Sequence, residues 1–153
     1  MKKKTQARIL FLFIFLFQLN INSTATTPRR LLLVCDTNSN LSYLSPTEIR
    51  KLFLNVPVIK NGVQLKPLRN VSDPLISDIF LQKVIFMSKR SYERKLLSRI
   101  FRYGGKNIPI YSEIHKLKAK LHLTPEAVTY MWSDQVEQDN SLKSLGVLWE
   151  DSN

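Results

Sequence analysis

Short, continuous apolar runs alternate along this chain with segments in which apolar residues recur every three or four positions. The first run, Leu31 to Cys35, is typical of a buried strand. Ser45-Pro46-Thr47-Glu48 then has the form of a capping box with proline at the first helical position. Because apolar residues at helical spacing follow it, the pattern predicts a helix over Pro46–Leu54.

The middle of the chain changes from an extended pattern to a helical one. Asn61-Gly62 is typical of a turn, and Val63 to Val71 is predicted to be extended. A helix is predicted from Pro74 to Ile85. Its core-facing residues are expected to be Leu75, Ile76, Ile79, Phe80 and Val84.

The second half repeats the alternation. Ser88 is expected to cap a longer helix, which runs to about Tyr103 and is ended by Gly104-Gly105. The apolar positions of this helix are Tyr92, Leu96, Ile100 and Tyr103. A strand at 108–111, a helix at 112–121 and a buried strand at 127–132 are predicted to follow. Strands separated by helices predict an α/β layered domain.

The N-terminus has the pattern of a signal peptide. Lys2, Lys3, Lys4 and Arg8 precede the apolar run Ile9 to Phe17, which is far shorter than the roughly 20 residues that span a bilayer. Ser23-Thr24-Ala25 supplies small residues for cleavage after Ala25. We therefore expect residues 1–25 to be removed and the mature protein to be periplasmic or secreted, with no transmembrane segment.

Composition limits what the mature chain can be. The formal net charge of the whole chain is +11, and without residues 1–25 it falls to +7 over 128 residues. That length predicts one domain over 26–153, with a core at about 31–132 and an acidic tail at 133–153. A single cysteine, Cys35, forms no internal disulfide, and we expect it to lie in the core as a small apolar group.

A strand that runs into a helix at Ser72-Asp73-Pro74 is the first candidate binding site. Backbone N–H groups and the positive end of a helix dipole there favour an anion, with Arg69 beside them. The candidate ligand-binding residues are Arg69, Asn70 and Ser72. The alternative is that Asp73 or Ser72 caps the helix, with Pro74 at its first position, so that the cap fills the site.

Several short motifs, taken in order, resemble one known family. The motifs are Asn38-Ser39-Asn40, the helix Leu44 to Leu54 ending like an F-L-G turn, Leu68-Arg69 before a polar turn, Ile100-Phe101 before Gly104-Gly105 like I-F-x-G, and Thr124 to Tyr130 like P-G-A-I-G-Y. Together they resemble the phosphate-type substrate-binding proteins of ABC transporters, which have the type 2 periplasmic-binding fold.

The resemblance implies a single lobe of that fold, with a mixed sheet flanked by helices. It also implies an exported, non-enzymatic solute-binding module for an oxyanion such as phosphate, working with a membrane transporter or a sensor protein. The family's D-G-S-G-T loop reads here Asn70-Val71-Ser72-Asp73-Pro74. This version has no glycine, and Asp73 places a negative charge where the anion would sit, so the anion loop is degenerate.

A one-lobed chain also leaves two other functions open. It could be a periplasmic protein-interaction or sensor-accessory domain with no small-molecule ligand, or a basic protein that binds a surface. Lys95, Arg99 and Arg102 share one face of the predicted helix at 88–103 and would suit an acidic partner or an anionic membrane. Nucleic acid is the last candidate, because Tyr92, Phe101 and Tyr103 fit core positions. The apolar patch Leu145 to Trp149 is expected to add an edge strand, with partner docking as the alternative.

Enzymatic chemistry has no recognisable pattern in this sequence. His115 and His122 are seven residues apart, which is not the spacing of a helical zinc site, and the chain has no Cys-x-x-Cys. The carboxylates show no pairing, and no nucleophile motif or phosphate-binding glycine loop occurs. We therefore expect no catalytic residues, no metal site and no cofactor.

Overall fold

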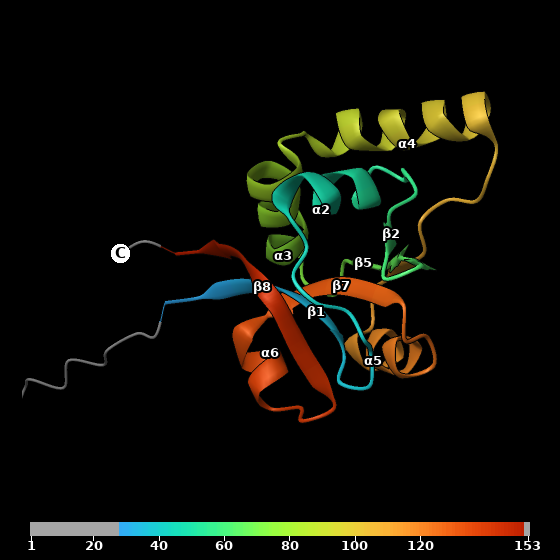
Figure 1. The fold of residues 1–153 in the computed structure, drawn as a ribbon. Coiled ribbons are helices and arrows are strands. Elements are labelled where there is room, and N and C mark those ends of the chain that lie inside the picture. The colour runs from blue at the N-terminus through green and yellow to red at the C-terminus, as the bar shows by residue number, and fades with distance from the viewer. Residues whose placement is uncertain (1–27, 152–153) are drawn as a thin grey trace, which may run out of the picture.

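A mixed four-stranded sheet forms the centre of the protein (Figure 1). The structure is a computed structural model that describes residues 28–151, so the predicted signal peptide lies outside the described residues. β1 (Arg30–Asp36) lies between β7 (Ala127–Trp132) and β8 (Leu142–Glu150) and pairs antiparallel with both. β4 (Lys66–Pro67) extends the sheet by parallel pairing with β7. The α/β class and the mixed sheet flanked by helices are confirmed.

Both faces of this sheet are covered by other parts of the chain. Neighbouring residues of β1 point to opposite faces, and the residues on each face lie in an apolar cluster. Leu31, Leu33 and Cys35 belong to one apolar cluster, and Leu32 and Val34 to a second. Helices α2 (Pro46–Phe53), α3 (Pro74–Ile79) and α4 (Lys89–Tyr103) lie over the first face, and α5 (Ile114–His122) and α6 (Ser133–Glu137) lie over the second (Figure 1). β1 and β7 are therefore buried on both sides, as the apolar run of β1 and the mainly apolar run of β7 indicate.

The helices begin close to where the sequence places them. α2 (Pro46–Phe53) begins with the complete capping box of Ser45 and Glu48. α4 (Lys89–Tyr103) is capped by Ser88, and α5 (Ile114–His122) lies on the other face. α6 (Ser133–Glu137), also on that face, lies in the segment predicted to be an acidic tail, where no helix is predicted. α3 (Pro74–Ile79) continues directly into a π-helix, η1 (Phe80–Ile85).

The predicted extended segment Val63 to Val71 consists of three short strands. β2 (Ile59–Lys60) and β3 (Val63–Gln64) form a hairpin around the predicted turn, in which Asn61 and Gly62 both have positive φ. The backbone pairing with β7 ends after β4, and β5 (Arg69–Asn70) pairs with β6 (Ile110–Tyr111) in a separate parallel pair. The chain therefore passes from the central sheet to a second, smaller one at Leu68.

Three expected core positions are wrong. Leu75 is 47% exposed because it lies on the first turn of α3, where Asp73 caps the helix at the surface. Phe101 is 87% and Tyr103 71% exposed, because only Tyr92 and Leu96 of α4 are fully buried and its last turns extend beyond the structure beneath. Within residues 28–151, none of the helices has the length and apolar character needed to cross a membrane.

The tail after Trp132 belongs to the fold. The apolar patch Leu145 to Trp149 lies in β8, which is an edge strand as expected and pairs with β1 along its whole length. Leu142 and Leu145 contribute to the two apolar clusters, and the Trp149 ring packs against that of Trp132 at 6.4 Å between centroids.

Candidate functional site

The predicted anion-binding arginine is buried and paired. Arg69 lies on β5 with its side chain 5% exposed, and its Nη2 lies 2.5 Å from Oε1 of Glu93 on α4. The guanidinium also lies over the ring of Tyr92, 4.9 Å from its centroid. Sequence reasoning missed Glu93, although it is the one acidic residue of α4 and directly follows the buried Tyr92.

Asn70 and Ser72 are also engaged within the chain. The Asn70 amide donates to the backbone oxygen of Tyr130 at 2.9 Å, which ties β5 to β7. Its Oδ1 accepts from the backbone N–H of Ser72 at 3.1 Å and from the Ser72 hydroxyl at 2.7 Å. The structure thus brings Asn70 and Ser72 together, and their contacts stabilise the turn before α3. The Arg69 side chain is not part of this group, because it is paired with Glu93 on α4.

Asp73 supplies the negative charge at this turn. It is the N-cap of α3, and its Oδ1 accepts from the backbone N–H of Leu75 at 2.9 Å. Its Oδ2 accepts from Trp132 Nε1 at 2.9 Å and lies 3.5 Å from Arg29. The Trp132 hydrogen bond, against a smaller effect of burial, holds the pKa of Asp73 below its usual range. The helix start therefore already binds a carboxylate of its own chain.

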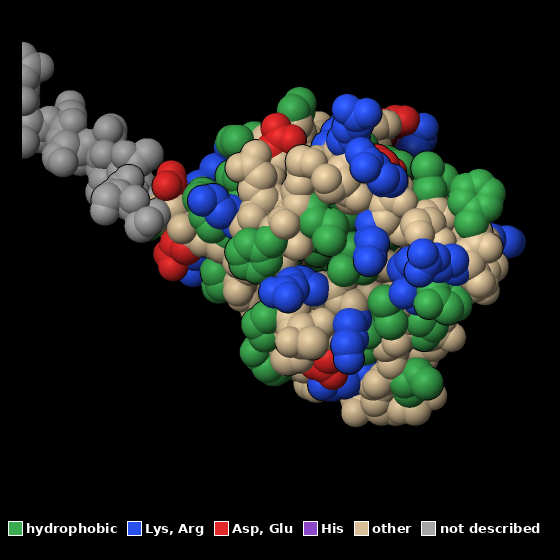
Figure 2. All heavy atoms as spheres, turned by 90° about the horizontal axis from the view of Figure 1, so that it is seen from above, with side chains coloured by type: hydrophobic (Ala, Val, Ile, Leu, Met, Phe, Trp, Pro, Cys, Tyr) green, Lys and Arg blue, Asp and Glu red, His purple; other side chains and the backbone are tan. Residues whose placement is uncertain are grey.

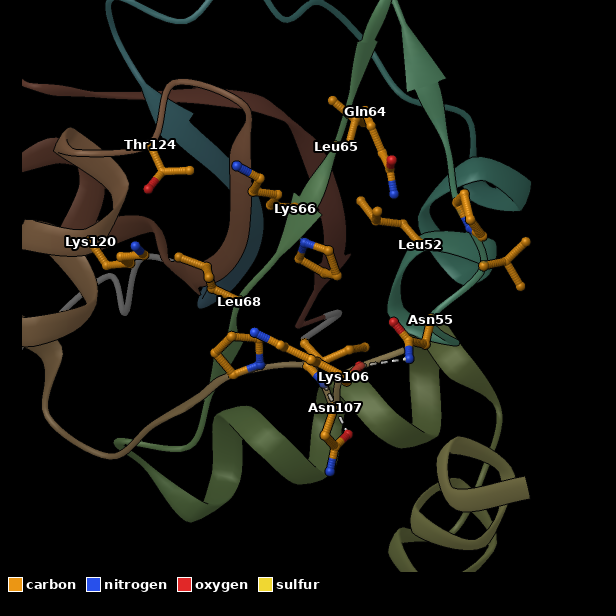
Figure 3. A pocket seen from close by; sticks show the side chains of 15 residues that line it. Leu52, Asn55, Gln64, Leu65, Lys66, Leu68, Lys106, Asn107, Lys120 and Thr124 are labelled. Carbon is orange, nitrogen blue, oxygen red and sulfur yellow. Dashed lines mark hydrogen bonds between the residues drawn. The ribbon is translucent and has the colours of Figure 1, made fainter. Parts of the chain in front are cut away.

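A pocket of about 680 Å³ opens on the other side of the same strand segment (Figure 3). Its walls come from the end of α2, from β3 and β4, from the loop after α4, and from α5 with the loop that follows it. Leu52 and Asn55 lie on one side of it, and Lys120 and Thr124 lie on the other (Figure 3). We call it the lysine-rimmed pocket, after Lys66, Lys106 and Lys120.

The wall of this pocket is mainly apolar. Its apolar residues are Leu52, Val56, Pro57, Leu65, Pro67, Leu68, Ile108 and Pro109. Asn55 holds two walls together, because its side-chain amide donates to the backbone oxygen of Lys106 at 3.1 Å. Asn55 follows the C-cap of α2 and has φ 62°, a left-handed conformation that asparagine tolerates well. The loop after α4 is therefore tied to the end of α2.

The charges at the rim are positive and mostly unpaired. Lys66 forms an ion pair with Glu126, which lowers the pKa of Glu126. Within residues 28–151, neither Lys106 nor Lys120 forms an ion pair. An apolar cavity with free ammonium groups at its edge suits an anion that carries an apolar body.

Three residues from distant parts of the chain form an Asp-His-Ser arrangement. Asp36 lies at the end of β1, and its Oδ2 contacts Nδ1 of His122 at the end of α5. His122 Nε2 lies 3.2 Å from the hydroxyl of Ser141. Burial opposes the charge on Asp36, but hydrogen bonds from His122 and Asn38 hold its pKa below the usual range. This order of acid, base and hydroxyl is that of a nucleophilic triad.

The other groups around Ser141 do not suit nucleophilic catalysis. The Ser141 hydroxyl contacts Asp139 Oδ1, and since a carboxylate only accepts, the hydroxyl proton points to Asp139 and not to His122. The backbone N–H groups of Ser141 and Leu142, the usual positions for oxyanion donors, donate to the side chain and backbone of Asp139. The triad-like contacts therefore join β1, α5 and the turn before β8.

The comparisons with known proteins do not assign a family or a function to this chain. No protein-family model matches the chain, and no curated protein matches it significantly.

The histidines and the cysteine of the described residues do not form a metal site. Within residues 28–151, no group of three or more histidine, cysteine or acidic side chains has the arrangement of a metal site. His115 is exposed and lies 3.3 Å from Glu113. The buried Cys35 thiol has a raised pKa, chiefly because of desolvation, as befits a core residue.

Proposed function

We propose that the protein is an exported, non-enzymatic solute-binding module whose ligand site is the lysine-rimmed pocket. The observation that carries this proposal is the combination of an apolar cavity of about 680 Å³ with two ammonium groups, those of Lys106 and Lys120, that form no ion pair in the described part of the chain. The ligand class is a monoanion with an apolar body, such as a medium-chain or aromatic carboxylate.

This proposal keeps the class of function that the resemblance to phosphate-type substrate-binding proteins implies, and it moves the site. An oxyanion at Arg69 would have to displace Glu93 from a buried guanidinium and would meet the Asp73 carboxylate at the helix start. Displacing Glu93 loses a charge-assisted contact, and Asp73 repels an incoming anion. A single lobe of the type 2 periplasmic-binding fold, delivering solute to a transporter or sensor protein, would be compatible with an open pocket of this kind.

Calorimetry on the purified protein tests this site. Sodium octanoate is expected to bind with a Kd below about 1 mM, and inorganic phosphate is expected to give no binding heat. Lys106→Ala with Lys120→Ala should weaken octanoate binding at least tenfold, because the two rim lysines that form no ion pair lose their charges. The control, Lys51→Ala with Lys83→Ala, removes equal charge outside this pocket, and Lys83 lines the second, smaller pocket of about 300 Å³.

Two results would contradict the proposal. Octanoate binding that the control pair weakens as much as the rim pair would mean that overall charge, or the second pocket, is responsible. Phosphate binding that Arg69→Ala abolishes, with no octanoate binding, would place a working oxyanion site at the turn before α3.

A covalent probe tests the non-enzymatic part of the proposal. A fluorophosphonate, which labels activated serines, is expected to leave the protein unlabelled because the Ser141 hydroxyl donates its hydrogen bond to Asp139 and not to His122. Labelling of the native protein that Ser141→Ala abolishes, and that Ser144→Ala leaves intact, would show that Asp36, His122 and Ser141 work as a hydrolytic triad.

A further inference from the structure

α4 carries an exposed face that the fold leaves without a partner. Arg90, Arg94, Leu97 and Phe101 recur at intervals of four, three and four residues and so share one side of the helix. Leu97 is 51% exposed and Phe101 87% exposed. Tyr92 and Leu96, which anchor the helix, lie on the other side. We call the set of Arg90, Arg94, Leu97 and Phe101 the α4 outer face.

α4 as a whole is strongly basic, although Lys95, Arg99 and Arg102 lie on the side of the helix that is turned away from this face. Further lysine and arginine side chains on α4 or just after it are Lys89, Lys95, Arg99, Arg102 and Lys106. Glu93 is the only acidic residue of the helix, and it is turned inward to Arg69. None of the basic residues of α4 forms an ion pair within residues 28–151. Figure 2 views the molecule from the side on which α4 lies, and there basic side chains are interspersed with exposed apolar ones.

The position of α4 makes this face accessible to a flat surface. The helix lies farther from the sheet than α2, along the outer edge of the molecule, and extends past the elements beneath it (Figure 1). A helix with apolar and aromatic side chains on one stripe and cations beside it is the pattern of a helix that lies in a membrane interface. The cations meet anionic headgroups, while the apolar side chains enter the layer beneath them.

We propose that the α4 outer face docks the protein onto an anionic phospholipid bilayer. Charge complementarity favours this occupant, since every charged side chain of the face is positive and an anionic leaflet presents a continuous layer of phosphates. An acidic protein or a nucleic acid would use the same cations. Neither of those partners requires Leu97 and Phe101 to enter a hydrocarbon layer, and this requirement is what the experiment measures.

Vesicle co-sedimentation of the purified protein tests the proposal. The vesicles are phosphatidylglycerol mixed with phosphatidylcholine, with pure phosphatidylcholine for comparison, and the N-terminus of the protein is first determined by sequencing. Binding to the anionic vesicles is expected at low salt and should weaken as salt is added, because the attraction between exposed charges is screened. Phosphatidylcholine alone should bind at least tenfold less.

Matched variants separate charge from insertion. Arg90→Ser with Arg94→Ser should weaken vesicle binding by about fivefold per arginine. The control Lys51→Ser with Lys83→Ser removes equal charge outside the face and should have a smaller effect. Leu97→Ser with Phe101→Ser should weaken binding at least tenfold, whereas Leu123→Ser, which removes an 80% exposed leucine on another element, should not.

Folding and alternative partners are checked with the same proteins. All variants change exposed side chains, and their melting temperatures should match the native one. Equal binding to both kinds of vesicle, or no loss on changing Leu97 and Phe101, would overturn the proposal. So would binding to RNA or to an acidic polypeptide at salt concentrations where the anionic vesicles no longer bind.

Discussion

Arg69 shows how one residue can have the right chemistry for an anion and still be committed to the fold. Its guanidinium is almost fully buried and is neutralised by Glu93, which is itself 37% exposed at its side chain. Burying an arginine without a partner is costly, so the pair holds β5 to α4. The role we infer for Arg69 is therefore to orient these two elements.

Removing Glu93 tests that role. Glu93→Ala leaves a buried cation without its carboxylate and is expected to lower the free energy of unfolding by about 2 kcal/mol. Chemical denaturation measures this loss. Glu137→Ala breaks the exposed pair with Arg30 and should leave the denaturation midpoint unchanged. Equal losses of unfolding free energy in the two variants would mean that the buried pair of Arg69 and Glu93 stabilises the fold no more than the exposed pair of Arg30 and Glu137.

Glu48 gives a prediction about pH. The backbone N–H of Ser45 and then the ammonium of Lys60 lower the pKa of Glu48 from 4.5 to about 2. Because the folded pKa lies below the unfolded one, this carboxylate stabilises the fold above its unfolded pKa, and the contribution is lost as the pH falls toward about 2.

Melting curves between about pH 6 and about pH 2 measure this effect. Glu48→Gln, which does not titrate, should reduce the dependence of the melting temperature on pH over that range. The exposed Glu150→Gln serves as the control, and its curve should run parallel to that of the native protein. If Glu48→Gln left the pH dependence of the melting temperature unchanged, protonation of Glu48 would not be a source of the loss of stability in acid.

Among the helices and strands, the sequence indicates where most of the elements lie but not which of their residues are buried by neighbouring elements. The runs 31–35 and 127–132 are buried strands because a strand covered on both faces needs no polar alternation. The helix starts at Ser45 and Ser88 can be predicted because each serine caps its helix by accepting a hydrogen bond from a backbone N–H only three residues away.

Long-range contacts have no such local signal. The periodicity of α4 suggests core positions at Phe101 and Tyr103, yet both are exposed, because a repeat of three or four residues does not tell where the supporting layer ends. Asp36, His122 and Ser141 likewise meet only when β1, α5 and the turn before β8 are in place. The lysine-rimmed pocket is lined by four separate segments, and no single sequence motif predicts it.

Asn55 is an element-scale test of that pocket, since it joins the end of α2 to the loop after α4. Asn55→Gly keeps the left-handed backbone but removes the amide, so octanoate binding should weaken while stability stays close to native. Asn55→Ala should weaken binding and also lower stability by about 1 kcal/mol, because alanine is strained at positive φ. Asn61→Gly, at a second left-handed position outside the pocket, should change neither quantity.

For the whole molecule, the C-terminal strand is part of the cooperative unit. Deleting 146–153 removes the partners of Arg30, Leu31, Leu32 and Leu33 on β1 and the indole that packs on Trp132. We expect the truncated protein to lose its cooperative melting transition. Deleting only 151–153, which lie beyond β8, should leave the transition in place. A truncated 146–153 variant that melts like the native protein would assign β8 to partner docking instead of the fold.

An NMR titration with sodium octanoate shows whether this ligand enters the lysine-rimmed pocket. Assigned backbone amide spectra of the purified protein, recorded with increasing octanoate, should show shifts concentrated at Leu52 to Val56, at Lys106 to Ile108 and around Lys120 and Thr124. The shifts should saturate together and vanish in the Lys106→Ala, Lys120→Ala variant. Shifts centred on Arg69 to Ser72, or no saturating shifts at all, would contradict the account.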